Sequence, residues 1–140
     1  MNTRFTELVG CALPLQLATL GGVGSVELTA AVAGAGGLGM MPRYLVTPAF
    51  DAVTGARGIN FTRPDRSLVD EVVAAARRAR VIEFFWAAPD AELIKPAQAE
   101  GALVAWQVGS AEEAVAAERA GADLVVAQGV EAGGHVRGRV

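Results

Sequence analysis

The sequence contains little of the chemistry that marks disulfide-bonded and metal-binding proteins. Among its 140 residues there is one cysteine, Cys11, and one histidine, His135. A lone cysteine excludes an internal disulfide and is typical of a reducing compartment. One cysteine and one histidine also supply too few ligands for a transition-metal cluster, so we expect no bound metal.

Apolar runs long enough to cross a membrane are missing as well. Residues 8–20 are too few to span a bilayer, and they include Pro14. The sequence before Cys11 superficially resembles a lipoprotein processing site. However, too little apolar sequence precedes this cysteine, and Glu7 interrupts it. We therefore expect a cytoplasmic protein with no membrane partner.

An excess of positive charge is also absent. The net charge is -3, and the arginines are interleaved with acidic residues, which argues against nucleic acid as a partner. The chain is 52% hydrophobic and 19% charged, a composition that favours folding around a core. Its length suits one domain, so we expect residues 1–140 to form a single domain.

Six short apolar segments alternate with segments of helical character. The predicted strands occupy residues 13–18, 38–41, 57–61, 81–86, 102–108 and 122–127. The predicted helices occupy residues 25–34, a segment capped by Asp65 or Ser67, and residues 90–100 and 110–120. Residues 42–54 are equally consistent with a short helix and a loop. Continuous apolar strands that alternate with helices predict a parallel sheet covered by helices.

Two architectures agree with this alternation. A complete (β/α)8 barrel takes about 250 residues, and the strand spacing here is compatible with most of such a barrel. An open Rossmann-like sheet of six strands would need no further residues, so length alone favours the open sheet.

The most informative segment follows the last predicted strand. Gly133 and Gly134 would let the backbone approach a ligand, and His135 comes directly after them. An imidazole changes charge near neutral pH and can act as a base or as a cationic donor. This pattern is typical of a ligand site in an α/β protein, and the alternative is an exposed histidine in a C-terminal tail.

Four segments together resemble the nitronate monooxygenase family, also called 2-nitropropane dioxygenases. They are residues 13–18, 25–39, 58–61 and 121–135. The resemblance implies an FMN-dependent enzyme with an α/β fold. This fold would be a partial (β/α)8 TIM barrel with about six parallel strands and intervening helices. By the same resemblance, residues 1–140 would be the N-terminal three quarters of the barrel, truncated before the last two units.

The resemblance also implies roles for individual residues. His135 would be the catalytic residue, taking a proton from a nitroalkane or holding its nitronate anion. Asn60 and Gln128 would contact the flavin, and Gly133 and Gly134 would approach the flavin or its phosphate. The residues taken without the resemblance allow other roles. Asn60 would then be a structural amide, and Gln128 a strand-end residue that faces water. The glycine pair would form an ordinary turn.

The implied activity is FMN-dependent oxidation of alkyl nitronates to a carbonyl compound and nitrite with oxygen, so the partners would be a small nitronate or nitroalkane and oxygen. The alternatives are an FMN-dependent enoyl-acyl-carrier-protein reductase, which shares the glycine-glycine-histidine turn, and an inactive truncated relative. The sequence departs from the family at Ala18-Thr19-Leu20, where Ala-Pro-Met is usual. A partial barrel would leave the edges of its sheet unpaired, and unpaired edges favour pairing between chains. A homo-oligomer is therefore possible.

Overall fold

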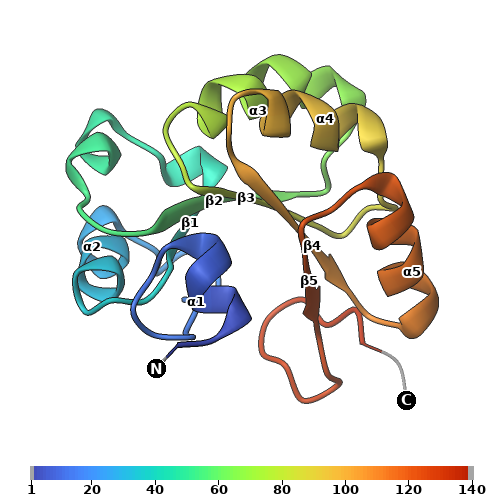
Figure 1. Cartoon of the computed structure of the whole chain (residues 1–140), viewed down its shortest axis with the longest axis horizontal. Coiled ribbons are helices and arrows are strands. Elements are labelled where there is room, and N and C mark those ends of the chain that lie inside the picture. Colours follow the sequence, from blue (N-terminus) through green and yellow to red (C-terminus); the bar gives the residue numbers. More distant parts are fainter. Residues whose placement is uncertain (1, 139–140) are drawn as a thin grey trace.

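Five parallel strands form one sheet in the computed structural model, which describes residues 2–138 (Figure 1). The strands are β1 (Gly39–Pro42), β2 (Arg57–Thr62), β3 (Val81–Phe85), β4 (Leu103–Val108) and β5 (Leu124–Ala127). They lie side by side in chain order, β1-β2-β3-β4-β5. A doubly wound sheet reverses its strand order, whereas a barrel does not. The partial barrel is therefore confirmed, and the Rossmann-like alternative is wrong.

The first predicted strand, residues 13–18, is only partly realised. Leu38 N–H donates to the Leu15 carbonyl, and Leu17 N–H donates to the Leu38 carbonyl. These bonds form one isolated parallel bridge, Gln16 with Leu38, rather than a full strand. Pro14 has no N–H to contribute, which shortens the ladder. The segment still lies beside the start of β1, in the place that the first barrel strand would take.

Residues 2–138 form five α-helices: α1 (Arg4–Val9), α2 (Val26–Gly34), α3 (Val69–Ala76), α4 (Ala91–Ala99) and α5 (Ala111–Ala120). Helices α2, α4 and α5 begin at side-chain caps, in which Ser25, Asp90 and Ser110 accept bonds from first-turn N–H groups. Asp65 caps a short 3-10 turn that leads into α3. None of the described helices is long and apolar enough to cross a membrane.

Two details differ from the expected helices. Pro96 does not break α4, which continues through it. The ambiguous segment 42–54 contains two 3-10 turns, Arg43–Leu45 and Pro48–Ala52. The sequence therefore placed α4 correctly and left residues 42–54 undecided. The structure shows that α4 continues through Pro96 and that residues 42–54 form 3-10 turns.

The two faces of the sheet bury different sets of side chains. Helices α3, α4 and α5 cover the outer face, where the buried strand residues are Ile59, Phe61, Ile82, Phe84, Val104 and Trp106. Alternate residues point to the inner face, where Met40, Val81 and Ala105 are buried. Because successive strand residues alternate, Asn60 and Glu83 lie on the inner face with this second set.

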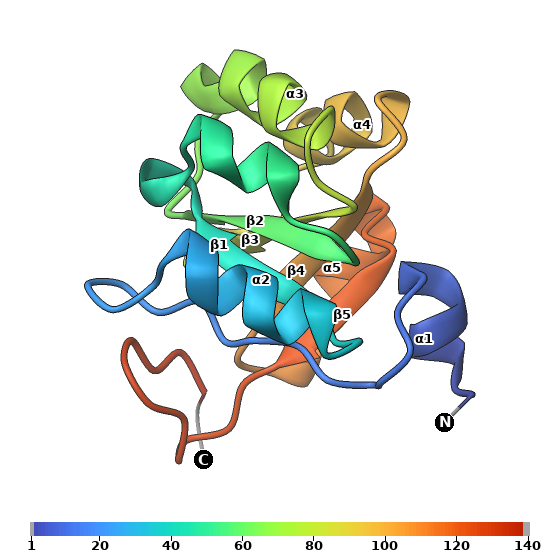
Figure 2. The same cartoon turned by 90° about the vertical axis from the view of Figure 1, so that its left-hand side faces the viewer.

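Helix α1 was not predicted from the sequence. It lies at the amino ends of the strands (Figure 2), and Val9 packs with Leu38 and Met40 in the inner cluster. Thr3 and Thr6 form a capping box at its start, and Gly10 ends it with a φ of 79°. A six-residue helix is too short to show a helical hydrophobic period, which explains why the pattern missed it.

Candidate functional site

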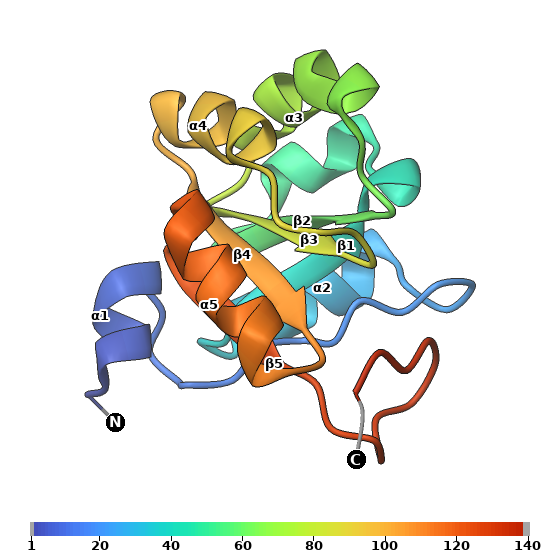
Figure 3. The same ribbon diagram turned by 90° about the vertical axis from the view of Figure 1, so that its right-hand side faces the viewer.

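Two loops meet the carboxyl ends of the strands, opposite α1. Figures 2 and 3 show the loop of residues 18–25, which precedes α2, and the loop of residues 128–138 on this side of the sheet. We call the strand carboxyl ends and these two loops the mouth. Barrel enzymes build their active sites at this end, because the loops there are free to vary. The predicted catalytic segment thus lies where a barrel site is expected.

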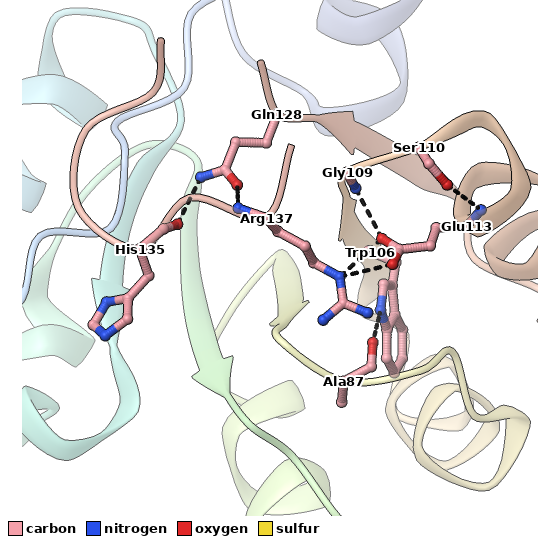
Figure 4. Close-up of polar contacts among 8 residues, drawn as sticks. All are labelled: Ala87, Trp106, Gly109, Ser110, Glu113, Gln128, His135 and Arg137. Carbon is pink, nitrogen blue, oxygen red and sulfur yellow. Dashed lines mark hydrogen bonds and ion pairs between the residues drawn. The ribbon is translucent and has the colours of Figure 1, made fainter. Parts of the chain in front are cut away.

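The side chain of Gln128 closes the loop that carries His135 (Figure 4). Gln128 Nε2 donates to the His135 carbonyl at 3.0 Å, and Arg137 N–H donates to Gln128 Oε1 at 2.6 Å. Both ends of the amide are therefore used inside the chain. Neither interpretation of Gln128 from the sequence included these bonds within the chain, and its predicted contact with the flavin stays a prediction.

Arg137 anchors the same loop to the body of the sheet. Its Nε lies 2.8 Å from Glu113 Oε2, in an ion pair whose partners are each about three-quarters buried. Glu113 Oε2 also accepts a bond from Gly109 N–H at 2.8 Å. The Arg137 backbone approaches Gly109 so closely that a Cβ at position 109 would collide with the Arg137 carbonyl. Glycine at the end of β4 is therefore required for the loop to dock.

His135 lies against Trp86, the residue that follows β3. The two ring centroids are 5.8 Å apart at 70°, an edge-to-face contact. The Arg137 guanidinium is 5.9 Å from the centroid of the Trp86 ring. Trp86 has a φ of 67°, whereas Trp106 fills the core position and is completely buried. Trp86 therefore belongs to the mouth and contacts one side of the His135 imidazole, and His135 is exposed to solvent.

The glycine pair before His135 is open. A Cβ at Gly133 or Gly134 would meet no atom within 4 Å, and Gly134 has a φ of 72°. Gly134 is thus needed for its backbone conformation, while the peptide groups of both residues remain accessible from outside.

Asn60 lies deep in the mouth, within a network that the sequence analysis missed. Its side chain is only 3% exposed, and Asn60 Nδ2 donates to Glu83 Oε1 at 2.8 Å. Gln16 Nε2 donates to the other Glu83 oxygen at 2.6 Å, and Thr62 Oγ1 donates to Asn60 Oδ1 at 3.0 Å. Burial raises the pKa of the Glu83 carboxyl, and the bonds from Gln16 and Asn60 oppose this rise.

The signal that could have found Glu83 was present in the sequence. Glu83 is the one charged residue in the apolar strand Val81–Phe85, and its side chain is 3% exposed. A carboxyl group that is buried without an arginine or lysine needs hydrogen-bond donors, and two amides provide them. The sequence alone did not show which amides these would be.

The structure brings four of the five predicted site residues into one loop. Gln128, Gly133, Gly134 and His135 lie in residues 128–138, and Asn60 comes from β2. Among the hydrogen bonds of the described residues, none joins Asn60 to this loop. At the mouth, Thr19 Oγ1 is buried and has no hydrogen bond among the described residues. Thr19 lies in the loop that departs from the Ala-Pro-Met pattern.

Comparison with known proteins agrees with this arrangement. The profile of the nitronate monooxygenase family matches residues 54–139, which include strands β2 to β5 and the His135 loop. The chain belongs to the nitronate monooxygenase family.

Curated relatives of this chain are named for two different activities. The (3aS,4S,5R,7aS)-5-hydroxy-7a-methyl-1-oxo-octahydro-1H-indene-4-carboxyl-CoA dehydrogenases of Rhodococcus jostii and Mycobacterium tuberculosis are 31% identical over 144 residues, 96% of this chain and 41% of theirs. The nitronate monooxygenase of Pseudomonas aeruginosa is 28% identical over 193 residues, 96% of this chain and 52% of its own. The chain therefore spans about half or less of the length of these relatives.

Solved structures reproduce the fold. FabK from Thermotoga maritima superposes with a TM-score of 0.85 at 29% identity, covering 100% of this chain and 48% of FabK. The nitroalkane oxidase from Streptomyces ansochromogenes superposes with a TM-score of 0.78 at 26% identity, covering 97% and 51%.

Proposed function

We propose that this chain provides the mouth of an FMN-dependent oxidoreductase that oxidises small nitronates with oxygen. The observation that carries the proposal is the position of His135, which follows an open glycine pair at the carboxyl ends of barrel strands in a member of the nitronate monooxygenase family. Barrel enzymes and flavin sites both use this end of the sheet.

The groups at the mouth suit a flavin. The pyrimidine edge of an isoalloxazine ring offers both hydrogen-bond donors and acceptors. The open peptide groups at Gly133 and Gly134, the unpaired hydroxyl of Thr19 and the exposed Thr62 would supply complementary partners. Asn60 and Gln128 would act mainly by shaping the mouth, since their amides already bond within the chain.

Bound FMN would accept electrons from the nitronate, and oxygen would complete its oxidation to a carbonyl compound and nitrite. His135 would remove the proton on the carbon beside the nitro group, or in its protonated form donate to a nitronate oxygen. Trp86 would hold the imidazole ring from one side, and the Gln128 bond to the His135 carbonyl would hold its backbone.

A second substrate class has support from the relatives. The two dehydrogenases named for a carboxyl-CoA substrate are 31% identical to this chain, compared with 28% for the nitronate monooxygenase. Oxidation of a nitronate without a nicotinamide donor would support the first proposal. Oxidation of an acyl-CoA with transfer of its electrons to an acceptor would favour the CoA substrate of the dehydrogenases. Reduction of an enoyl thioester that depends on NAD(P)H would favour the enoyl reductase alternative.

Titration of the ¹⁵N-labelled chain with FMN, followed by NMR, tests the site without requiring turnover. We expect saturable shifts in the backbone amide signals of Gly133 and Gly134. Gly101 is the matched control, since it also has a positive φ and an open surround but precedes β4 at the amino ends of the strands. Equal shifts at Gly101, or no saturable shift at the glycine pair, would show that the proposed site is wrong.

A further inference from the structure

The inner face of the sheet contains a carboxyl group that the proposed chemistry does not use. Glu83 lies in register with Asn60 on one side and Ala105 on the other. The groups that contact its carboxyl are the amides of Gln16 and Asn60, and no arginine or lysine in residues 2–138 forms an ion pair with it. A buried acid in such a setting controls how its neighbours can point.

The hydrogen bonds are donated in one direction, from Thr62 at the mouth to Asn60 and from Asn60 to Glu83. Both carboxyl oxygens accept from amide NH₂ groups, as an ionised carboxylate does, and in this state Asn60 turns Nδ2 inward and Oδ1 outward. Asn60 Oδ1 then accepts the single hydroxyl hydrogen of Thr62. Thr62 is exposed at the carboxyl end of β2 and has only acceptor lone pairs left for anything that binds there.

We propose that Glu83 is a positioning residue that fixes the Asn60 amide, so that Thr62 presents a hydrogen-bond acceptor to an N–H group of the bound ligand. The choice of ligand rests on the function proposed above, because the N3–H of an oxidised flavin is such a group. The orientation of Asn60 itself does not depend on a ligand.

Glu83→Gln tests the orientation directly in the ligand-free chain. A glutamine offers one oxygen and one NH₂ group, so it cannot accept from both Gln16 and Asn60, and one amide must turn. We expect the side-chain NH₂ signals of Asn60 in a ¹⁵N NMR spectrum to shift strongly, while the signals of Gln98, which bonds Gly121 and Asp123 on the surface, stay in place. Unmoved signals from both side-chain amides, Asn60 and Gln16, would overturn the proposal.

FMN affinity tests whether the effect reaches the mouth through Thr62. Thr62→Val keeps the side-chain shape and removes the acceptor, so we expect affinity to fall about five- to tenfold, as for the loss of one hydrogen bond. Thr62→Ser should restore it. In the Glu83→Gln/Thr62→Val double variant the two losses should not add, because both remove the same interaction.

The outcomes separate the two proposals. Fully additive losses would overturn the positioning role. Unchanged affinity in Thr62→Val would overturn it even if Glu83→Gln proved unable to fold. If FMN does not bind the unaltered chain at all, the proposed function is wrong. The Asn60 and Gln16 signals in Glu83→Gln then decide the positioning role alone.

Discussion

Single residues at the mouth are held by partners from distant parts of the chain. Glu113 on α5 holds Arg137, Trp86 after β3 contacts both His135 and Arg137, and Gln128 closes the loop between them. A catalytic group must be fixed in position before it can act, and these contacts fix the backbone and one side of the imidazole.

Replacing His135 by alanine should separate proton removal from cofactor binding. In a complete or complemented form of the enzyme, we expect turnover of a neutral nitroalkane to fall at least about 100-fold, the usual contribution of a positioned base, while FMN affinity stays within about twofold. Turnover of a preformed nitronate should fall less, because its proton has already left. Steady-state assays with both substrate forms measure the difference, and unchanged nitroalkane turnover would remove His135 from the proposed role.

Glu83 should make the protein less stable as the pH rises. Its folded-state pKa lies above the ordinary glutamate value of about 4.3, because burial disfavours the charged form. The stabilising contribution is complete below the unfolded pKa and is lost as pH rises through the folded pKa. Melting temperatures of the unaltered chain and of Glu83→Gln, compared from pH 4 upward, should converge or cross. Parallel profiles would contradict the expectation.

Loss of Arg137 should loosen the His135 loop more than it affects the rest of the fold. Arg137→Met keeps the apolar stem and removes the bond to Glu113, so we expect hydrogen exchange at the Arg137 amide to accelerate about fivefold or more. Arg77→Met is the control, since Arg77 forms an exposed ion pair with Glu100 on the outer helices. Equal exchange in the two variants would show that the Glu113 anchor is unimportant.

At the scale of elements, helix ends carry clear local signals. Ser110 caps the start of α5, and Gly121 ends it with a φ of 100°. Both features act within one helical turn, so they depend on neighbouring residues rather than on long-range contacts. These ends place Glu113 in the first turn of α5, where it can reach the loop.

Two glycine-to-alanine changes should have opposite signs. Gly121→Ala forces alanine into a left-handed conformation and should destabilise the fold by about 1 kcal/mol. The added Cβ makes no close contact, so a steric clash would not contribute to this loss of stability. Gly34→Ala lies in α2 with an ordinary φ and open space, and should stabilise by up to about 1 kcal/mol. Urea denaturation measures both. The same sign for the two variants would contradict this account.

At the scale of the whole molecule, the sheet ends at β5, which has a partner only in β4 among the described residues. An open strand edge is a template for pairing with another chain. The expectation that residues 1–140 act as a single domain stays a prediction, which cooperative unfolding in calorimetry would support.

Self-association should depend on the β5 edge. We expect the mass of the chain in light scattering to rise with concentration, and Val125→Lys to reduce this rise because a charged side chain blocks edge pairing. Val115→Lys is the control, since Val115 on α5 is 43% exposed and Val125 is 42% exposed. A mass that stays monomeric, or an equal effect of the two lysines, would contradict the prediction.

Local features of the sequence were sufficient to locate most elements and the His135 loop. Caps at Ser25, Asp90 and Ser110 bond to N–H groups two or three residues away, so short patterns identify them. The first strand was predicted too long, and α1 was not predicted. Both elements are short, so the hydrophobic periodicity is weak in residues 13–18 and in α1.

The sequence by itself therefore determined the alternation of strands and helices and the loop that carries His135, because those signals lie within a few residues of one another. The alternation itself left barrel and open sheet undecided, and the resemblance to the family predicted the barrel that the strand order confirms. Only the tertiary structure decided that Gln16 and Asn60 meet Glu83, from 67 and 23 residues away. Such contacts depend on strand register and burial across the whole sheet, which no local pattern specifies.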